Sequence, residues 1–569
     1  MTVTQKLRMK TLRPLIIICL ILLTSGGLTS EAQIEIGSTV DSGGPLMKEQ
    51  AAYDVKSYDL DLRLDPVEQS IKGVLTALAV ILEPTGWFVL DLDPRFQVDA
   101  ITLTDASGKS LGELKHERRA GKLWISFPTL KRPGENVRVR IAYAGKPRVA
   151  PYPPWRGGFI WSKTLSGEPW VGVACQGEGA DIWFPVKDHP SDKPETTSLH
   201  FTVPQPLVAA SNGRLQSVVT NQDGTQTFNW FISSPISNYN ITLNVAPYKT
   251  IEDKFVSASG ETVPITFWVL PESYDKGAGL IKKVKDYLRF FETYLGPYPF
   301  RSEKVGIVQT RYLGMEHQTI IAYGNNFRYD VYGFDWLMFH ELGHEWWGNL
   351  VTASDWRDSW LHEGFQSFMD TLYLERLQGK DAYMKGMTNR IRHLRNMQPV
   401  APRESRTSTQ MFWAAPDYVT SDSDIYDKGG LILHTLRRLI GDKAFFAALR
   451  RMAYPDRRME RVTNGQQVRF GTTDEFIKIA ESTSGMKLGW FFEVYLRQSN
   501  LPRLVVENTG NKVSLRWEAP ANLTFPMPVD VQVGGKTKRY EMKAGKTSVP
   551  IKQGQSVTVD PENWILKAP

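Results

Sequence analysis

The chain has 569 residues and a formal net charge of +7, and this length favours three or four domains over a single core. Hydrophobic residues make up 41% of it and charged residues 23%, which is ordinary for a globular protein and excludes a largely disordered chain. No Lys/Arg run is interleaved with aromatic residues, so we do not expect nucleic acid as a partner.

Residues 1–32 are predicted to be a secretory signal peptide. Several basic residues precede an apolar run over 15–23, and a small, polar stretch follows and ends at Ala32. The apolar run is shorter than the roughly 20 residues that span a bilayer, so we expect no stable membrane span once the signal is removed. Whether the signal is cleaved or kept as an anchor stays open.

Export to the periplasm or the medium of a bacterium is the expected localisation. Removal of residues 1–32 leaves Cys175 as the only cysteine, so the mature chain can form no internal disulfide. Export without disulfides is more typical of a bacterial protein than of a eukaryotic extracellular one. The oligomeric state cannot be read from the sequence.

Residues 33–52 are predicted to be a linker and residues 53–250 an N-terminal β-domain. The linker contains Gly, Ser and Pro between positions 37 and 45. In 58–64, apolar residues alternate strictly with charged ones, which indicates a half-buried strand, and similar short runs continue to about residue 245.

Residues 251–500 are predicted to be a mainly helical domain and residues 501–569 a small β-sandwich. Apolar residues recur at helical spacing from 280 to 295, where a Gly-Pro pair ends the pattern. Thr472 and Glu475 form a capping-box pattern ahead of a later helix. Alternating apolar residues return after Pro502. The expected fold class is therefore α+β and multidomain.

The segment MFHELGHEWWGN, residues 338–349, contains the HExxH pattern. Residues four apart share one face of a helix, so His340 and His344 can direct two imidazole nitrogens at one ion, with Glu341 beside them. The simpler alternative is two surface histidines on one helix.

Glu363 is the predicted third ligand. It lies in WLHEGF, eighteen residues after His344, which allows a turn and a second helix to return a carboxylate to the ion. Two imidazoles and one carboxylate leave a position for water, as in catalytic zinc sites, and these ligand types favour one zinc ion. Asp370 follows two helical turns later on the same face and is expected to orient a ligand imidazole, the alternative being a solvated helix acid.

HELGHEWWGN, the eighteen-residue gap and WLHEGF together resemble the gluzincin zinc aminopeptidase family, which includes aminopeptidase N and leukotriene hydrolase. The resemblance covers nearly the whole chain after residue 32. It implies a saddle-like N-terminal β-domain, a thermolysin-like, mainly helical catalytic domain and a small C-terminal β-sandwich, in the order predicted above. Many relatives carry a further C-terminal helical domain that roofs the active site. For a short form without it we expect a more open cleft that admits longer peptides.

The resemblance also implies roles for further residues. The segment GMEH, residues 314–317, is similar to the family's Gly-x-Met-Glu-Asn loop, so Glu316 is expected to bind the α-ammonium group of a substrate. His317 replaces the Asn, which leaves the hydrogen bonding of this loop open. Tyr426 lies in a segment similar to Tyr-x-Lys-Gly and is expected to donate a hydrogen bond to the oxyanion. Gln176 stands where relatives have a Glu or Gln that also contacts the amino terminus.

The implied function is zinc-dependent hydrolysis of the N-terminal peptide bond of peptides. Zinc would activate a water molecule, and Glu341 would take its proton and pass it to the leaving nitrogen. A zinc epoxide hydrolase of the same fold and a non-catalytic peptide-binding member remain as alternatives. An endopeptidase is a third, which Glu316 argues against. The preferred first residue and the physiological substrate cannot be read from the motifs.

Overall fold

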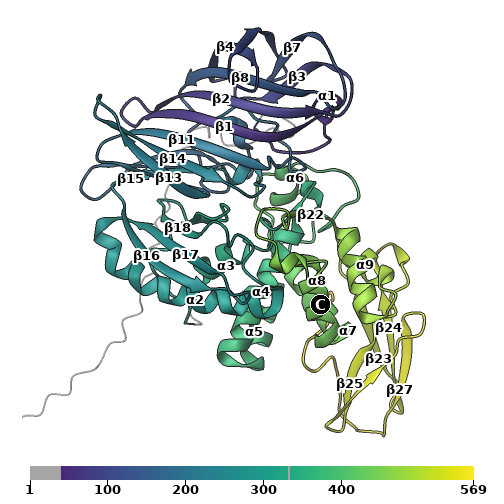
Figure 1. Ribbon diagram of the computed structural model, residues 1–569. Helices are drawn as coiled ribbons and strands as arrows, with labels where there is room; N and C mark the ends of the chain where they lie inside the picture. Colours follow the sequence, from purple (N-terminus) through teal and green to yellow (C-terminus); the bar gives the residue numbers. More distant parts are fainter. Residues whose placement is uncertain (1–39, 331–332) are drawn as a thin grey trace, which may run out of the picture. The chain divides into compact units, whose positions relative to one another are not determined.

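The computed structural model describes residues 40–330 and 333–569 of the chain (Figure 1). The predicted signal peptide, residues 1–32, lies outside the described residues. Among the helices of the described part of the chain, none is long and apolar enough to cross a membrane.

The predicted linker, residues 33–52, is more ordered in its described part than the sequence suggested. It contains the short helix α1 (Lys48–Ala51), and Ser42 is only 3% exposed. Gly43 adopts a φ of +82°, and a Cβ atom on it would lie 2.3 Å from the Trp356 ring. This glycine, which the sequence indicated only as part of a linker, therefore permits a tight approach to the catalytic domain.

The N-terminal β-domain is built on three sheets. The largest sheet contains, in spatial order, β13 (Arg214–Thr220), β14 (Thr225–Ile232), β11 (Thr196–Pro204), β1 (Tyr53–Asp65), β2 (Ser70–Ile81), β8 (Asn136–Gly145), β4 (Phe96–Thr104) and β5 (Ser110–Glu113). A second contains β12 (Val208–Ser211), β15 (Leu243–Ala246), β10 (Pro169–Ala174) and β9 (Gly158–Lys163). A third contains β3 (Thr85–Asp91), β7 (Lys122–Lys131) and β6 (Lys115–Arg119).

The strand predicted over 58–64 is the second half of β1. Its buried and exposed residues alternate, because successive side chains of a strand point to opposite faces of the sheet. Leu60 and Leu62 are at most 1% exposed and belong to the core. The alternation in the sequence therefore reports directly which face of the sheet is covered.

The catalytic domain begins with a sheet that the sequence analysis did not separate from its helices. This sheet contains β16 (Lys249–Val256), β17 (Thr262–Val269), β18 (Val305–Gln309), β20 (Ile321–Tyr323) and, at the edge, β19 (Gly314–Met315). The last three strands have five residues or fewer, too few for a periodic pattern to identify. The "mainly helical" description therefore holds for the rest of the domain.

The helices of this domain follow one another along the chain (Figure 1), and they carry four candidate site residues: His340, Glu341, Glu363 and Asp370. They are α2 (Tyr274–Leu295), α3 (Trp336–Gly343), α4 (Trp360–Gln378), α5 (Lys380–Ile391), α6 (Ser408–Phe412), α7 (Asp427–Ile440), α8 (Asp442–Ala453), α9 (Thr473–Ser484) and α10 (Gly489–Leu496). β21 (Val351–Ala353) and β22 (Arg469–Gly471) form a small parallel pair.

Two helix boundaries follow their sequence signals. α2 ends at Leu295, and Gly296 adopts a φ of +100° after it, a conformation that favours glycine. α9 begins after Thr472, whose side chain accepts a hydrogen bond from the backbone N–H of Glu475 over 3.2 Å. This N-cap was predicted from the capping-box pattern.

The C-terminal part consists of two three-stranded sheets. One contains β23 (Arg503–Asn508), β24 (Lys512–Glu518) and β27 (Lys546–Pro550), and the other β26 (Lys536–Tyr540), β25 (Val529–Val533) and β28 (Val557–Val559). Val513 and Leu515 of the first sheet and Val529 and Val531 of the second are nearly completely buried. The prediction of a β-rich N-terminal domain, a helical catalytic domain and a C-terminal β-rich region is confirmed.

Candidate active site

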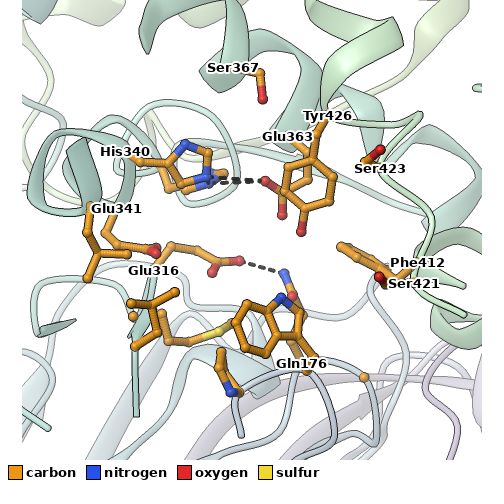
Figure 2. A pocket seen from close by; sticks show the side chains of 18 of the residues that line it. Gln176, Glu316, His340, Glu341, Glu363, Ser367, Phe412, Ser421, Ser423 and Tyr426 are labelled. Carbon is orange, nitrogen blue, oxygen red and sulfur yellow. Dashed lines mark hydrogen bonds and ion pairs between the residues drawn. The ribbon is translucent and has the colours of Figure 1, made fainter. Parts of the chain in front are cut away.

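A cavity of about 430 Å³ lies where the β-domain meets the helices of the catalytic domain. Its lining includes Gln176 from the β-domain, Glu316 after β19, His340 and Glu341 from α3 and Tyr426 before α7. Figure 2 shows these side chains pointing into one space. Segments far apart in the sequence therefore converge on a pocket of the size that binds small molecules or the end of a peptide.

His340, His344 and Glu363 form a compact group whose ligand atoms all lie within 4.8 Å of one another. The Nε2 atoms of the two histidines are 3.2 Å apart. Glu363 Oε2 lies 3.6 Å from Nε2 of His340 and 3.4 Å from Nε2 of His344. The three residues predicted as ligands are thus brought together.

This group fits a zinc ion. Ligand atoms about 2.1 Å from a tetrahedral ion lie about 3.4 Å from one another, close to the separations found here. Glu363 Oε2 is buried and has no hydrogen-bond partner, which is costly for a carboxylate oxygen unless a cation faces it. His344 Nδ1 donates to the carbonyl oxygen of Trp347 over 2.7 Å, so its Nε2 lone pair is turned toward the group.

α3 carries His340, and His344 follows directly after its last residue. Asp335 caps its N-terminus by accepting a hydrogen bond from the backbone N–H of Met338 over 3.1 Å. The helix ends at Gly343, and His344 follows it with helical backbone angles. The four-residue spacing therefore holds, although His344 stands at the C-cap and not inside the helix.

Asp370 of α4 holds His340 as the sequence predicted. Its Oδ2 accepts a hydrogen bond from His340 Nδ1 over 2.8 Å. Gln366 Nε2 donates to the other oxygen over 2.9 Å, and Trp336 Nε1 approaches Oδ2 at 3.3 Å. Arg390 of α5 lies 3.6 Å away. A carboxylate fixed in this way sets the tautomer and the orientation of the imidazole.

The ionisable groups of the metal site and its neighbours shift one another's pKa values. Burial alone lowers the pKa of the His340 imidazole, but the Asp370 carboxylate raises that pKa well above its usual range. Burial would raise the pKa of the Glu363 carboxyl, but His344 and His340 hold it well below its usual range. Burial raises the pKa of the Glu341 carboxyl to about 8, against the lowering effect of the two histidines. The ionisable groups of the site are therefore buried, and their charges interact strongly.

Glu316 and Gln176 meet on the other side of the cavity. Gln176 Nε2 donates to Glu316 Oε1 over 2.6 Å, as the dashed line in Figure 2 marks. The hydroxyl of Tyr239 donates to the same oxygen over 3.1 Å. Burial raises the pKa of the Glu316 carboxyl. A buried carboxylate with an oxygen facing the cavity is suited to pair with a cation.

His317 does not take part in the cavity wall. It is fully buried beside Glu316, and both of its ring nitrogens lack a hydrogen-bond partner. Burial lowers the pKa of its imidazole to about 3, so the ring is neutral. The side chain that replaces the Asn of the resembled motif therefore packs beneath the loop and does not act as a fourth metal ligand.

Tyr426 is brought to Glu363 by a close helix contact. A Cβ atom on Gly364 of α4 would lie 2.9 Å from the backbone of Gly429 of α7, so both glycines are needed for the approach. Burial raises the pKa of the Tyr426 hydroxyl, and the nearby carboxylates of Glu363 and Glu316 raise it further. The tyrosine therefore stays protonated and can donate a hydrogen bond into the cavity.

Tyr239 and Arg390 are functional candidates that the sequence analysis missed. Arg390 donates to Asp427 Oδ1 over 2.7 Å and to the backbone carbonyl of Ser367 over 2.8 Å, and thereby joins α5, α4 and α7 behind the cavity. No motif surrounds either residue. Only the folded chain brings them to the site.

Aminopeptidases of known name match part of the chain. Human endoplasmic reticulum aminopeptidase 1 is 24% identical over 413 residues, which are 68% of this chain and 42% of the relative. Probable aminopeptidase 2 of Sulfurisphaera tokodaii is 24% identical over 394 residues, 65% of this chain and 47% of the relative. Mouse aminopeptidase N is 28% identical over 51% of this chain and 32% of its own length. The chain spans less than half the length of these relatives.

Solved structures share the fold over a larger part. An M1 zinc metallopeptidase mutant from Deinococcus radiodurans, bound to the substrate Tyr-Ser-Ala, is 25% identical with a TM-score of 0.64, over 82% of this chain and 98% of that one. A two-domain M1 zinc metallopeptidase mutant bound to L-tryptophan is 24% identical, with a TM-score of 0.63 and the same coverage.

Two protein-family models match the two regions of the chain that form the cavity. Residues 55–240 match the peptidase M1 N-terminal domain, and residues 280–457 match the peptidase family M1 domain. Together they account for more than half of the chain, which therefore belongs to peptidase family M1.

Proposed function

We propose that this protein is a zinc aminopeptidase that holds one zinc ion and removes the first residue of peptides. The observation that carries the proposal is the buried Glu316 carboxylate, which faces the same cavity as His340, His344 and Glu363. A carboxylate at that place pairs with a free α-ammonium group and limits how many residues fit before the metal. The peptide substrates named for the Deinococcus structure and the aminopeptidase names of the relatives support the same class of reaction.

Substrate binding would begin at the ammonium group. Its three N–H groups can donate to Glu316 Oε2 and to the Gln176 side-chain oxygen, since Glu316 Oε1 already accepts from Gln176 Nε2 and Tyr239. The fixed position of this end places the first carbonyl toward the metal ligands and not a later one. A peptide with a blocked amino group would leave the buried carboxylate without a cation to pair with, which is costly.

Zinc, when bound, polarises the scissile carbonyl and lowers the pKa of water. Glu341 takes a proton from the attacking water and delivers it to the leaving nitrogen, so the oxygen of water goes to the carbonyl carbon as the C–N bond breaks. Tyr426 donates a hydrogen bond to the carbonyl oxygen as negative charge grows on it. The products are one free amino acid and a peptide shorter by one residue.

The test is hydrolysis of aminoacyl-p-nitroanilides by the chain from residue 33 onward, with and without a chelator. We expect release that stops on chelation, returns with one equivalent of zinc, and falls by about a hundredfold or more in Glu341→Gln and in Glu316→Ala. Glu272→Ala, an exposed acid outside the cavity, is the control and should keep wild-type activity.

Other outcomes identify the alternatives. Cleavage of an N-acetylated peptide at an internal bond would make the protein an endopeptidase. Turnover of a lipid epoxide with none of a nitroanilide would make it an epoxide hydrolase. Stoichiometric zinc without turnover of either substrate would leave a non-catalytic binding protein.

We also propose that the protein is exported and that residues 1–32 are removed on export. The basic residues and the apolar run over 15–23 support this proposal. N-terminal sequencing of protein recovered from the periplasm or medium should begin at Gln33. Protein that stays in the cytoplasm with its first residues intact would contradict it.

A further inference from the structure

Two stacked aromatic side chains stand at the wall of the cavity. Tyr152 and Trp155 lie on the loop before β9, with ring centroids 5.1 Å apart and ring planes 26° apart, and both line the cavity. They are 58% and 40% exposed. Large aromatic surfaces left open at a pocket are typical of sites that bind an apolar group.

Phe412, the last residue of α6, is a further aromatic side chain that lines the cavity. Its ring meets the Tyr426 ring edge to face, with centroids 6.3 Å apart. In Figure 2, Phe412 lies beyond Gln176 and Tyr426, on the side of the cavity away from Glu341. We call Tyr152, Trp155 and Phe412 the aromatic wall.

The loop that carries the aromatic wall is tied to the catalytic domain. The Arg156 guanidinium lies 3.7 Å from the centre of the Trp413 ring, and it donates to the carbonyl oxygen of Tyr418 over 3.3 Å. Both contacts of Arg156 join the loop of Trp155 to the segment that follows Phe412. The aromatic wall is therefore held as one unit, although its residues come from two domains.

Arg390 and Asp422, two further charged residues that line the cavity, are engaged with other groups of the protein. Arg390 is paired with Asp427 and Asp370. Asp422 is only 3% exposed and accepts hydrogen bonds from the backbone N–H of Asp424 and from Gln398 Nε2. A basic or acidic substrate side chain would therefore lose its water beside the aromatic wall without gaining a dedicated partner.

We propose that the aromatic wall receives the first side chain of the peptide and selects aromatic first residues. This inference rests on the proposed aminopeptidase activity. With the ammonium group at Glu316 and the first carbonyl toward the metal ligands, the remaining substituent of the first Cα must point to a free side of the cavity, and the aromatic wall lies on one. Ser421, which also lines the cavity beside Phe412, is small and leaves room for a ring.

The test is the kcat/KM of nitroanilides of Phe, Tyr, Leu, Ala, Lys and Asp, compared within one enzyme. We expect Phe and Tyr to exceed Ala by about a hundredfold, because each added methylene in an apolar pocket contributes about tenfold or more. Trp155→Ala and Phe412→Ala should each lower the Phe:Ala ratio by about tenfold, and Trp155→Phe should restore most of it. Ser421→Phe should fill the space and lower the ratio while leaving all three residues of the aromatic wall in place.

Tyr274→Ala is the matched control, because Tyr274 is also 40% exposed but lies on α2 outside this cavity; its Phe:Ala ratio should equal that of the wild type. A wild type that cleaves Ala as fast as Phe, or that prefers Lys, would overturn the inference while leaving the aminopeptidase proposal standing. Wild-type ratios in both Trp155→Ala and Ser421→Phe would overturn it too. No cleavage of any nitroanilide would instead count against the proposed function itself.

Discussion

Replacing Asp370 by Asn is expected to weaken zinc binding without changing the fold. The two oxygens of Asp370 accept from different donors, His340 Nδ1 over 2.8 Å and Gln366 Nε2 over 2.9 Å. An amide has one oxygen, so in Asp370→Asn an NH₂ group must face one of these donors. Loss of such a partner of a ligand imidazole typically costs about 10–100-fold in metal affinity, which is about 1.4–2.7 kcal/mol.

The assay is competition for zinc with a chromophoric chelator at fixed pH, using apoprotein of each variant. Glu375→Gln is the matched control, because Glu375 lies on the same helix but pairs with Arg437, 2.6 Å away. The control should bind zinc like the wild type, and thermal unfolding of the apoproteins should show that Asp370→Asn is folded. A folded Asp370→Asn protein that binds zinc as tightly as Glu375→Gln would refute the assigned role of Asp370.

Three further changes test other parts of the structure. Arg390→Met leaves Asp427 buried without the partner that lies 2.7 Å from it, and urea unfolding should show a loss of about 3 kcal/mol; a loss below about 1 kcal/mol would contradict this. Asp41→Ala removes the carboxylate that accepts a backbone N–H of α6 over 3.0 Å, and the same assay should show a loss of about 1.5 kcal/mol. The hydrogen bond to Asp59 raises the pKa of His200 to about 9, above its unfolded value of about 6.5. Its stabilisation is therefore complete below about pH 6.5 and is lost as the pH rises through about 9. His200→Gln should flatten the fall of the unfolding midpoint across that window, and an unchanged slope would refute the pairing.

The metal-binding group could be predicted from the sequence because its residues lie close to one another along the chain. His340 and His344 are four residues apart, a spacing that a helix turns into proximity, and Glu363 and Asp370 share a face of the next long helix. Once the first two ligands are identified, few placements remain for the others. The same locality explains why β1 and α2 were predicted, since each repeats its burial pattern over several periods.

The substrate-binding side could be predicted only in part, because it depends on contacts between distant segments. Glu316 and Gln176 were found through a family motif, whereas Tyr239 and Trp155 have no local signature. A lone tyrosine or tryptophan between strands resembles any packing residue until the fold shows what it faces. The short strand β19 was missed for a related reason, because two residues cannot display an alternation.

Residues of the zinc-binding segment itself hold the Glu316 loop at a fixed distance from the metal ligands. Glu345 and Asn349 follow the second histidine ligand, and both reach back to the loop that carries Glu316. Glu345 Oε1 accepts the backbone N–H of Thr319 over 2.8 Å, and Asn349 Nδ2 donates to the backbone carbonyl of Glu316 over 3.0 Å. All four residues are nearly fully buried, so water does not compete for these bonds. The polar residues of HELGHEWWGN thus do more than bind the ion. They fix how far the Glu316 carboxylate stands from it, and in the proposed reaction that spacing limits removal to one residue at a time.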